Sequence, residues 1–184
     1  MVIVEGMDNS GKTTLVRALS DDCKLLVMNN RRRPKTKEDV FDYVDIVVPM
    51  ARRFPVILDR FAPISEPIYG PICRSSHILT KDDVSRCMLR VSRGPMNPGL
   101  TFGNQSMALI IYCRPRDSTI LGFKPEIAQM DRVIENGQAL LQAYDKSMKE
   151  LGSFWFTVVH YDWEIDSYDS LKNLVSQHFQ NHAN

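Results

Sequence analysis

Short apolar runs alternate along this chain with longer segments in which apolar residues recur every three or four positions. Runs of this length are typical of buried strands, and the spacing of the longer segments is typical of amphipathic helices. The pattern predicts strands at residues 1–5, 24–28, 55–59, 107–113 and 154–161. It predicts helices at residues 12–20, 37–53, 80–92, 126–151 and 167–179, and a loop rich in Gly, Pro and Asn at 93–106.

Strands that alternate with helices indicate an α/β fold, with a five-stranded, mostly parallel sheet and helices on both faces. In such a sheet, ligands bind beside the carboxyl ends of the strands. The chain has 184 residues and no linker-like segment, so we expect one domain spanning residues 1–184.

Composition adds a few limits to this picture. No apolar run approaches the roughly 20 residues that a membrane helix needs, so we expect no membrane partner. The four cysteines are scattered without metal-ligand spacing, which favours reduced thiols and a cytoplasmic protein.

Charge is unevenly distributed along the chain. Residues 31–116 hold 12 Arg and 3 Lys against 8 acidic residues, a net +7, while residues 1–30 carry −1 and residues 117–184 carry −5. A basic middle between acidic flanks indicates an anionic ligand gathered at one place, although a solvated basic face explains it equally well.

The strongest chemical signal is a glycine-rich loop between the first strand and the first helix. Residues 6–13 fit G-x-x-x-x-G-K-[ST], a pattern whose backbone N–H groups cradle phosphates. Its lysine reaches the β- and γ-phosphates, and its hydroxyl residue binds Mg²⁺. The sequence therefore predicts ATP and Mg²⁺ as cofactors, held by Gly6, Asp8, Asn9, Ser10, Gly11, Lys12, Thr13 and Thr14.

A second element supports the phosphate loop. The third predicted strand ends in Asp59, which we expect to hold Mg²⁺ together with Thr13. Arg60 follows directly and favours a kinase, because it could hold an acceptor's phosphate. A non-kinase P-loop ATPase or a GTPase switch is the alternative of a different class. The stretch Thr80–Asp83 matches the guanine-reading pattern [NT]-K-x-D, but capping of the helix that follows explains it better.

At these residues the sequence resembles the thymidylate kinase family. Residues 5–14 are similar to that family's E-G-x-D-G-S-G-K-[ST]-T loop, residues 59–61 to its D-R-[YFH] motif, and Gly70 and Arg74 to a following Gly and Arg. The resemblance implies a P-loop NTPase fold, with Asp8 near the reacting oxygen of the acceptor and Arg60 and Arg74 on the acceptor's phosphate. It also implies a short lid near residues 114–125, in which Arg114 or Arg116 would act at the transferring phosphate.

In the segments that would bind the acceptor, this sequence differs from the usual pattern of the thymidylate kinase family. Residues 59–74 (DRFAPISEPIYGPICR) and 129–133 look like those of bacteriophage-encoded members. One branch of these phosphorylates 5-hydroxymethyl-deoxyuridine within phage DNA, for thymidine hypermodification. Such DNA is the preferred acceptor, because Arg31–Arg33 and the loop at 93–106 would suit a polymer. A kinase of free deoxynucleoside monophosphates is the alternative. A phage origin would place the protein in the host cytoplasm, and a homodimer is left open.

Four further interpretations concern single residues. Asp8 would orient or deprotonate an acceptor hydroxyl, or it caps the helix. Glu66 would contact the acceptor, or it is a solvated loop acid. Tyr69 and Phe61 would stack on an acceptor base, or they belong to the core. Trp163 would lie in the core or at its rim.

Overall fold

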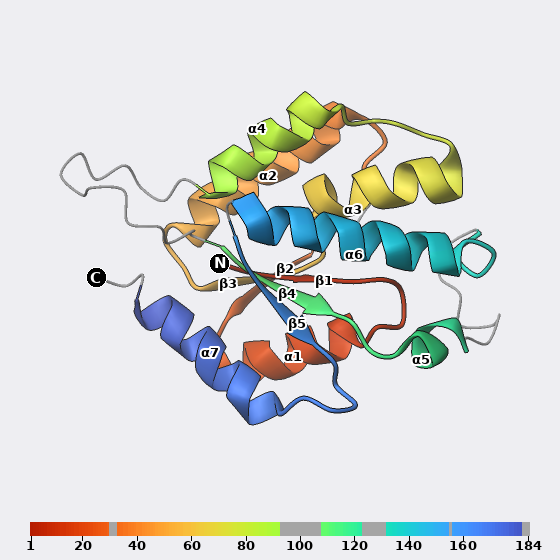
Figure 1. The fold of residues 1–184 in the computed structure, drawn as a ribbon. Helices are drawn as coiled ribbons and strands as arrows, with labels where there is room; N and C mark the ends of the chain where they lie inside the picture. Colours follow the sequence, from red (N-terminus) through yellow and green to blue (C-terminus); the bar gives the residue numbers. More distant parts are fainter. Residues whose placement is uncertain (30–32, 93–107, 123–131, 155, 182–184) are drawn as a thin grey trace.

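The computed structural model describes residues 1–29, 33–92, 108–122, 132–154 and 156–181. Its centre is a five-stranded sheet in the order β2-β3-β1-β4-β5 (Figure 1). The strands are β1 (Val2–Glu5), β2 (Leu26–Asn29), β3 (Val56–Asp59), β4 (Leu109–Cys113) and β5 (Thr157–Tyr161). Every pairing between them is parallel, so the predicted sheet is confirmed.

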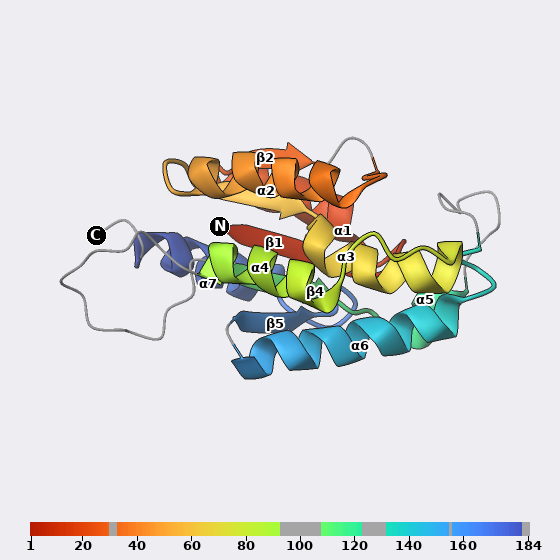
Figure 2. The same ribbon diagram turned by 90° about the horizontal axis from the view of Figure 1, so that it is seen from above.

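Helices cover both faces of the sheet, as predicted (Figure 1). One face is covered by α1 (Lys12–Cys23) and α7 (Tyr168–Gln180). The other is covered by α2 (Lys37–Ala51), α3 (Ala62–Tyr69), α4 (Lys81–Ser92) and α6 (Gly137–Phe154). Across this second layer, α3 and α4 lie between α2 and α6 (Figure 2). A short helix, α5 (Asp117–Leu121), follows β4.

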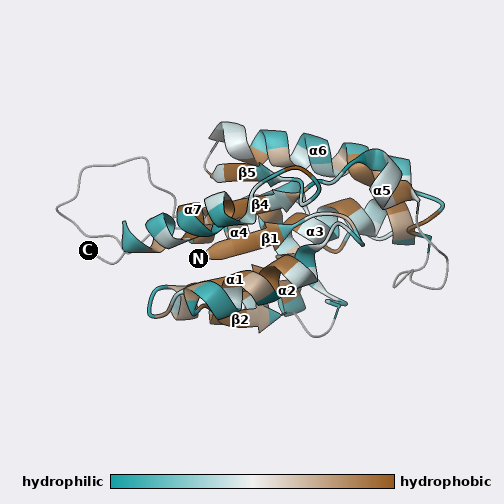
Figure 3. Cartoon of the chain, turned by 90° about the horizontal axis from the view of Figure 1, so that it is seen from below, coloured by the Kyte–Doolittle hydropathy of each residue, from teal (hydrophilic) through white to brown (hydrophobic). Residues whose placement is uncertain are grey.

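The core explains why the strands are continuous apolar runs rather than alternating ones. Ile3, Leu58 and Ile110 pack toward α2, α3, α4 and α6, while Val4 and Ile57 pack toward α1 and α7. A strand covered on both faces has no solvent side, so it needs no polar residues. Figure 3 shows β1 in the hydrophobic colour between helices whose colours alternate.

Several helical segments differ from the sequence prediction, among them α5 and the π-helical turn Gly70–Arg74, which were not predicted. The helix expected at 126–151 begins at Gly137: residues 132–136 form turns, and 126–131 lie outside the described residues. Helix α3 was not predicted, and it contains Pro63 and Pro67, a residue type that usually interrupts helices. Pro63 sits in the first turn, where an N–H would have no intrahelical partner, so a proline fits there at little cost.

The predicted cap at Thr80 is confirmed. The Asp83 N–H donates to Thr80 Oγ1 at 3.1 Å, and the Thr80 N–H donates to Asp83 Oδ2 at 3.0 Å. Because Asp83 is occupied in this reciprocal cap, it is not available to read a guanine base. Among the described helices, none combines the length and the apolar character that crossing a membrane requires.

Candidate active site

The phosphate loop joins the carboxyl end of β1 to the start of α1. Three of its residues have positive φ angles, namely Gly6 (145°), Asn9 (61°) and Gly11 (86°). A Cβ on Gly6 would lie 2.6 Å from the carbonyl oxygen of Cys113, so the loop can pass β4 this closely only with glycine at that position. The curl that the sequence pattern predicts is therefore present.

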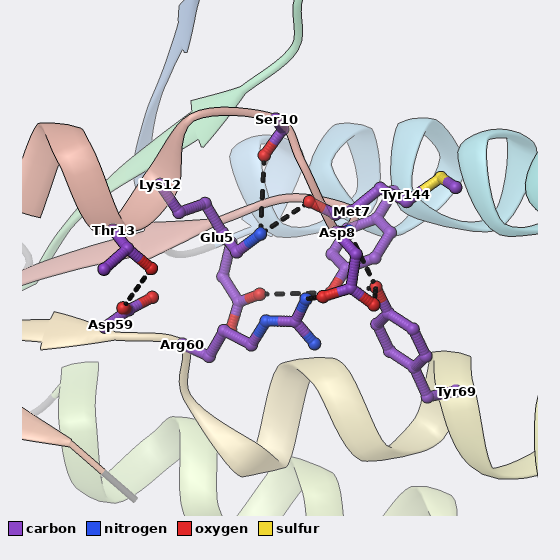
Figure 4. Close-up of polar contacts among 10 residues, drawn as sticks. All are labelled: Glu5, Met7, Asp8, Ser10, Lys12, Thr13, Asp59, Arg60, Tyr69 and Tyr144. Carbon is purple, nitrogen blue, oxygen red and sulfur yellow. Dashed lines mark hydrogen bonds and ion pairs between the residues drawn. The ribbon is translucent and has the colours of Figure 1, made fainter. Parts of the chain in front are cut away.

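Lys12 lies inside this loop with only 6% of its surface exposed. Its Nζ donates to the Met7 carbonyl at 2.5 Å and to Ser10 Oγ at 3.5 Å (Figure 4). Burial, followed by the nearby charge of Arg60, lowers the pKa of Lys12 to about 8. With the described residues Lys12 makes no ion pair, so its buried charge is held by neutral partners and fits a phosphate anion.

The two predicted Mg²⁺ ligands lie together. Thr13 Oγ1 donates to Asp59 Oδ2 at 2.9 Å (Figure 4). The contact follows from the sheet, since Val4 of β1 is in register with Asp59 of β3. No cluster of three or more metal-binding side chains occurs among the described residues. A hydroxyl and one carboxylate nevertheless fit Mg²⁺ that takes its other ligands from phosphates and water.

Asp8, Arg60 and Tyr69 form a hydrogen-bonded cluster at the edge of the phosphate loop (Figure 4). The Arg60 guanidinium forms an ion pair with Asp8 and donates to the Tyr69 hydroxyl at 3.2 Å. That hydroxyl donates to Asp8 Oδ2 at 3.2 Å and accepts from the Asp8 N–H at 3.1 Å. Arg60 has a φ of 70°, an uncommon conformation for a residue with a side chain. Strain of this kind is often found at functional sites.

Glu5 lies beneath this cluster and is fully buried. Its Oε1 accepts from the Phe61 N–H at 2.6 Å, and its Oε2 accepts from the Tyr144 hydroxyl at 3.3 Å. Burial raises the pKa of Glu5 to about 7, although the hydrogen bond from the Phe61 N–H and the charges of Arg60 and Lys12 act in the opposite direction. No role was predicted for Glu5 from the sequence. Its position could have indicated one, because it is a carboxylate at the end of an otherwise apolar strand, next to the phosphate loop.

Phe61 and Tyr69 were expected either to stack on an acceptor base or to belong to the core. Phe61 is 0% exposed and belongs to the core, which confirms the second alternative and leaves no exposed ring face for stacking. Tyr69 is 1% exposed. The Arg60 guanidinium lies over its ring at 4.8 Å, and the Tyr144 ring packs against it at 5.9 Å. Tyr69 therefore holds Asp8 and Arg60 in place and presents no open face for stacking.

Glu66 and Arg74 form a second ion pair, in which each side chain is only 9% exposed. Arg74 Nε and Nη1 are buried and have no hydrogen-bond partner among the described residues. Burial raises the pKa of Glu66, and the charges of Arg74, Arg33 and Arg60 oppose this. Glu66 is thus not a solvated loop acid, and Arg74 retains donors that an anionic ligand could use.

The predicted lid arginines have different surroundings. Arg114 Nε and Nη2 donate to the two carboxylate oxygens of Asp145 at 2.9 and 3.2 Å, and its Nη1 lies 2.6 Å from Asp117 Oδ1. Arg114 therefore joins the end of β4 to α6, and action at a phosphate would require these pairs to break. Arg116 is exposed, and its side chain forms no ion pair with a described residue.

Several predicted features lie outside the described residues. These are Arg31 and Arg32, the loop at 93–106, residues 123–125 of the lid and residues 129–131. Trp163, in contrast, is described and lies at the rim, 49% exposed. A Cβ on Gly11 would lie 3.0 Å from its ring, so this tryptophan stands beside the phosphate loop. The sequence could not predict that proximity, which depends on the loop after β5.

Comparison with solved structures places the whole chain in a known architecture. YorR from Bacillus subtilis, solved with phosphorylated GDP, matches 100% of this chain and 98% of its own at a TM-score of 0.70 and 20% identity. Deoxyadenosine kinase from M. mycoides, solved with dCMP and dCDP, matches 98% of each chain at a TM-score of 0.51 and 14% identity. The fold is that of the P-loop NTPases. No family model matches the sequence, and no curated protein matches it.

Proposed function

We propose that this protein is an ATP-dependent kinase that transfers the γ-phosphoryl group to a thymine-like deoxynucleotide. The observation that carries the proposal is the meeting of three groups at the carboxyl ends of β1 and β3. They are the buried Lys12, the Thr13–Asp59 pair and the Asp8–Arg60 pair. The nucleotides bound to YorR and to deoxyadenosine kinase support a nucleotide ligand for the same fold.

The donor half of the site would work by neutralising charge. The phosphate loop and Lys12 would bind the β- and γ-phosphates, while Thr13 and Asp59 would hold Mg²⁺. When bound, ATP-Mg²⁺ supplies the phosphoryl group that is transferred. A buried ammonium is effective here, because water does not screen it from the charge that develops on the phosphoryl oxygens.

The acceptor half would use Asp8, Arg60 and Arg74. A bond forms between an acceptor oxygen and the γ-phosphorus, the bond from that phosphorus to the β–γ bridging oxygen breaks, and ADP leaves. For a hydroxyl acceptor, Asp8 would take the proton, whereas a phosphate acceptor needs no base. The unpartnered nitrogens of Arg74 support an acceptor that carries a phosphate.

Two acceptors meet this description. The first is 5-hydroxymethyl-deoxyuridine within DNA, which the resemblance of residues 59–74 to phage-encoded kinases supports. The second is a free deoxynucleoside monophosphate, which the free nucleotides bound to the two similar proteins support. They differ in the role of Asp8, which would act as a base only for the hydroxymethyl group.

The test is transfer of labelled γ-phosphate from ATP-Mg²⁺ to both acceptor types in parallel. One set is DNA with 5-hydroxymethyluracil beside unmodified DNA, and the other is a panel of free deoxynucleosides and their monophosphates. Label on the modified DNA alone would establish a DNA kinase, and label on monophosphates alone would establish a nucleotide kinase. Absence of transfer to every acceptor would refute the proposal.

A pair of lysine variants makes the test specific to the site. Lys12→Ala should abolish transfer while leaving the fold intact, because it removes the charge that faces the phosphates. Lys146→Ala removes an exposed lysine on α6 and should leave transfer unchanged. An active Lys12→Ala enzyme would show that the phosphate loop is not the donor site.

A further inference from the structure

Among the described residues, three buried side-chain atoms have no hydrogen-bond partner: Tyr43 Oη, Arg74 Nε and Arg74 Nη1. An unpartnered buried polar group costs free energy, so native proteins keep few of them. Under the proposed function, the Arg74 nitrogens bind the acceptor's phosphate. The Tyr43 hydroxyl, on α2, has no role in the phosphoryl transfer described for the site.

Tyr43 lies beside the segment that carries Arg60. Its ring packs against Phe61 with the centroids 6.3 Å apart, and Phe61 directly follows Arg60. Burial raises the pKa of Tyr43, and the negative charges of Glu5 and Asp59 raise it further. Both acidic residues belong to the candidate site, and Asp59 is the expected Mg²⁺ ligand. Its apolar neighbour on α2, Val44, is fully buried.

We propose that Tyr43 is an acceptor-binding residue, whose hydroxyl forms a hydrogen bond with a neutral oxygen of the acceptor nucleoside. The inference rests on the proposed kinase function and extends it to a second contact point. The carboxylate of Asp59 would repel an anion at this position, so the acceptor's phosphate belongs at Arg74 and a neutral group belongs at Tyr43. In a free monophosphate, the deoxyribose 3′-hydroxyl and a pyrimidine carbonyl have this chemistry. In a nucleotide within DNA the 3′ oxygen is esterified, so the pyrimidine carbonyl is the group that fits.

Tyr43→Phe tests the inference because it removes one oxygen and leaves the ring that packs against Phe61. With the acceptor that the wild-type protein uses, kcat/KM should fall about tenfold, as expected for the loss of one hydrogen bond. The KM for ATP-Mg²⁺ should not change. The melting temperature should stay the same or rise, because no hydrogen bond of the described protein is lost.

Acceptor analogues identify the group that Tyr43 contacts. One analogue carries sulfur in place of a pyrimidine carbonyl oxygen and can be used free or within DNA. For a free monophosphate acceptor, a second analogue lacks the 3′-hydroxyl. The wild-type protein and the variant should differ with the parent acceptor and become equal with the analogue that lacks the contacted oxygen. The inference would be overturned if Tyr43→Phe lowered kcat/KM equally for every acceptor, or did not lower it at all. A lowered melting temperature with unchanged acceptor kinetics would also overturn it.

A second tyrosine provides the matched control. The Tyr168 hydroxyl on α7 donates to Asp22 at 3.0 Å, on the opposite face of the sheet. Tyr168→Phe should leave acceptor kinetics unchanged, so a loss of the same size in this variant would also contradict the inference.

Failure of the proposed function would be recognised separately, by the absence of phosphoryl transfer in the wild-type protein. In that case, thermal stabilisation by deoxynucleoside monophosphates decides the role of Tyr43. Stabilisation of the wild-type protein that is weaker in Tyr43→Phe would support the contact. Equal stabilisation of both proteins, or none, would overturn it.

Discussion

Glu5 offers a prediction that depends on its burial and on no assumption about substrate. Its side chain is fully buried, and its two oxygens accept from the Phe61 N–H and the Tyr144 hydroxyl. Burial raises the pKa of the carboxyl from 4.5 to about 7 in the folded protein. Glu5→Gln keeps the shape and one acceptor oxygen but removes the ionisation. The variant therefore isolates the effect of charging this group.

The direction in which stability changes with pH follows from the raised pKa of Glu5. The folded protein binds the proton more tightly than the unfolded chain, so the contribution of Glu5 to stability is complete below pH 4.5 and is lost as the pH rises to about 7. The shift corresponds to about 3 kcal/mol at 1.36 kcal/mol for each pKa unit. The free energy of unfolding of Glu5→Gln, minus that of the wild-type protein, should rise by about 2 kcal/mol between roughly pH 5 and pH 8.

The assay is urea unfolding of both proteins across this pH range, in the absence of nucleotide. Only the change in the difference with pH is used, so a constant effect of the substitution on packing cancels. Glu150→Gln, at an exposed position on α6, controls for the loss of one carboxylate. If the free energies of unfolding of Glu5→Gln and the wild-type protein differ by the same amount at every pH, Glu5 is not a buried carboxyl with a raised pKa.

Three further predictions concern the donor site and the core. Lys12→Ala should lower kcat about a hundredfold or more in a transfer assay, and activity close to that of the wild-type protein would contradict its role. Asp59→Asn should raise the Mg²⁺ concentration needed for half-maximal activity about tenfold, and an unchanged Mg²⁺ titration would exclude Asp59 as a ligand. Leu140→Ala, at a fully buried position on α6, should lower the free energy of unfolding by about 2–5 kcal/mol. Leu26→Ala, at a position that is 42% exposed, should lower the free energy of unfolding by less than about 1 kcal/mol. If denaturant unfolding showed the same loss for both variants, burial would not determine the cost of truncating a leucine.

The fold was largely predictable because its signals are local. The apolar runs that became β1, β3 and β4 are covered on both faces, so burial requires an uninterrupted run of apolar residues. The helix α3 was missed for the opposite reason. Its two prolines and its mixed composition carry no periodic signal, and tertiary packing of Ile64 and Ile68 into the core stabilises it.

The sequence by itself determined the phosphate loop. The glycines, Lys12 and Thr13 are neighbours along the chain, and their chemistry depends on backbone conformations that the residue types themselves favour. The expected pairing of Thr13 with Asp59 was also within reach of the sequence. Parallel strands that lie side by side bring their carboxyl ends to one edge of the sheet.

Only the tertiary structure decided which polar side chains already have hydrogen-bond or ion-pair partners and which can still donate to a ligand. Arg114 and Arg74 look alike in the sequence, yet Arg114 is held by two carboxylates, while two nitrogens of Arg74 have no hydrogen-bond partner in the described part of the chain. Phe61 was expected either to stack on a base or to belong to the core, and it lies in the core. Tyr43 drew no prediction and packs against Phe61. The physical reason is that burial and hydrogen-bond partners come from residues distant in the chain, and no local pattern records them.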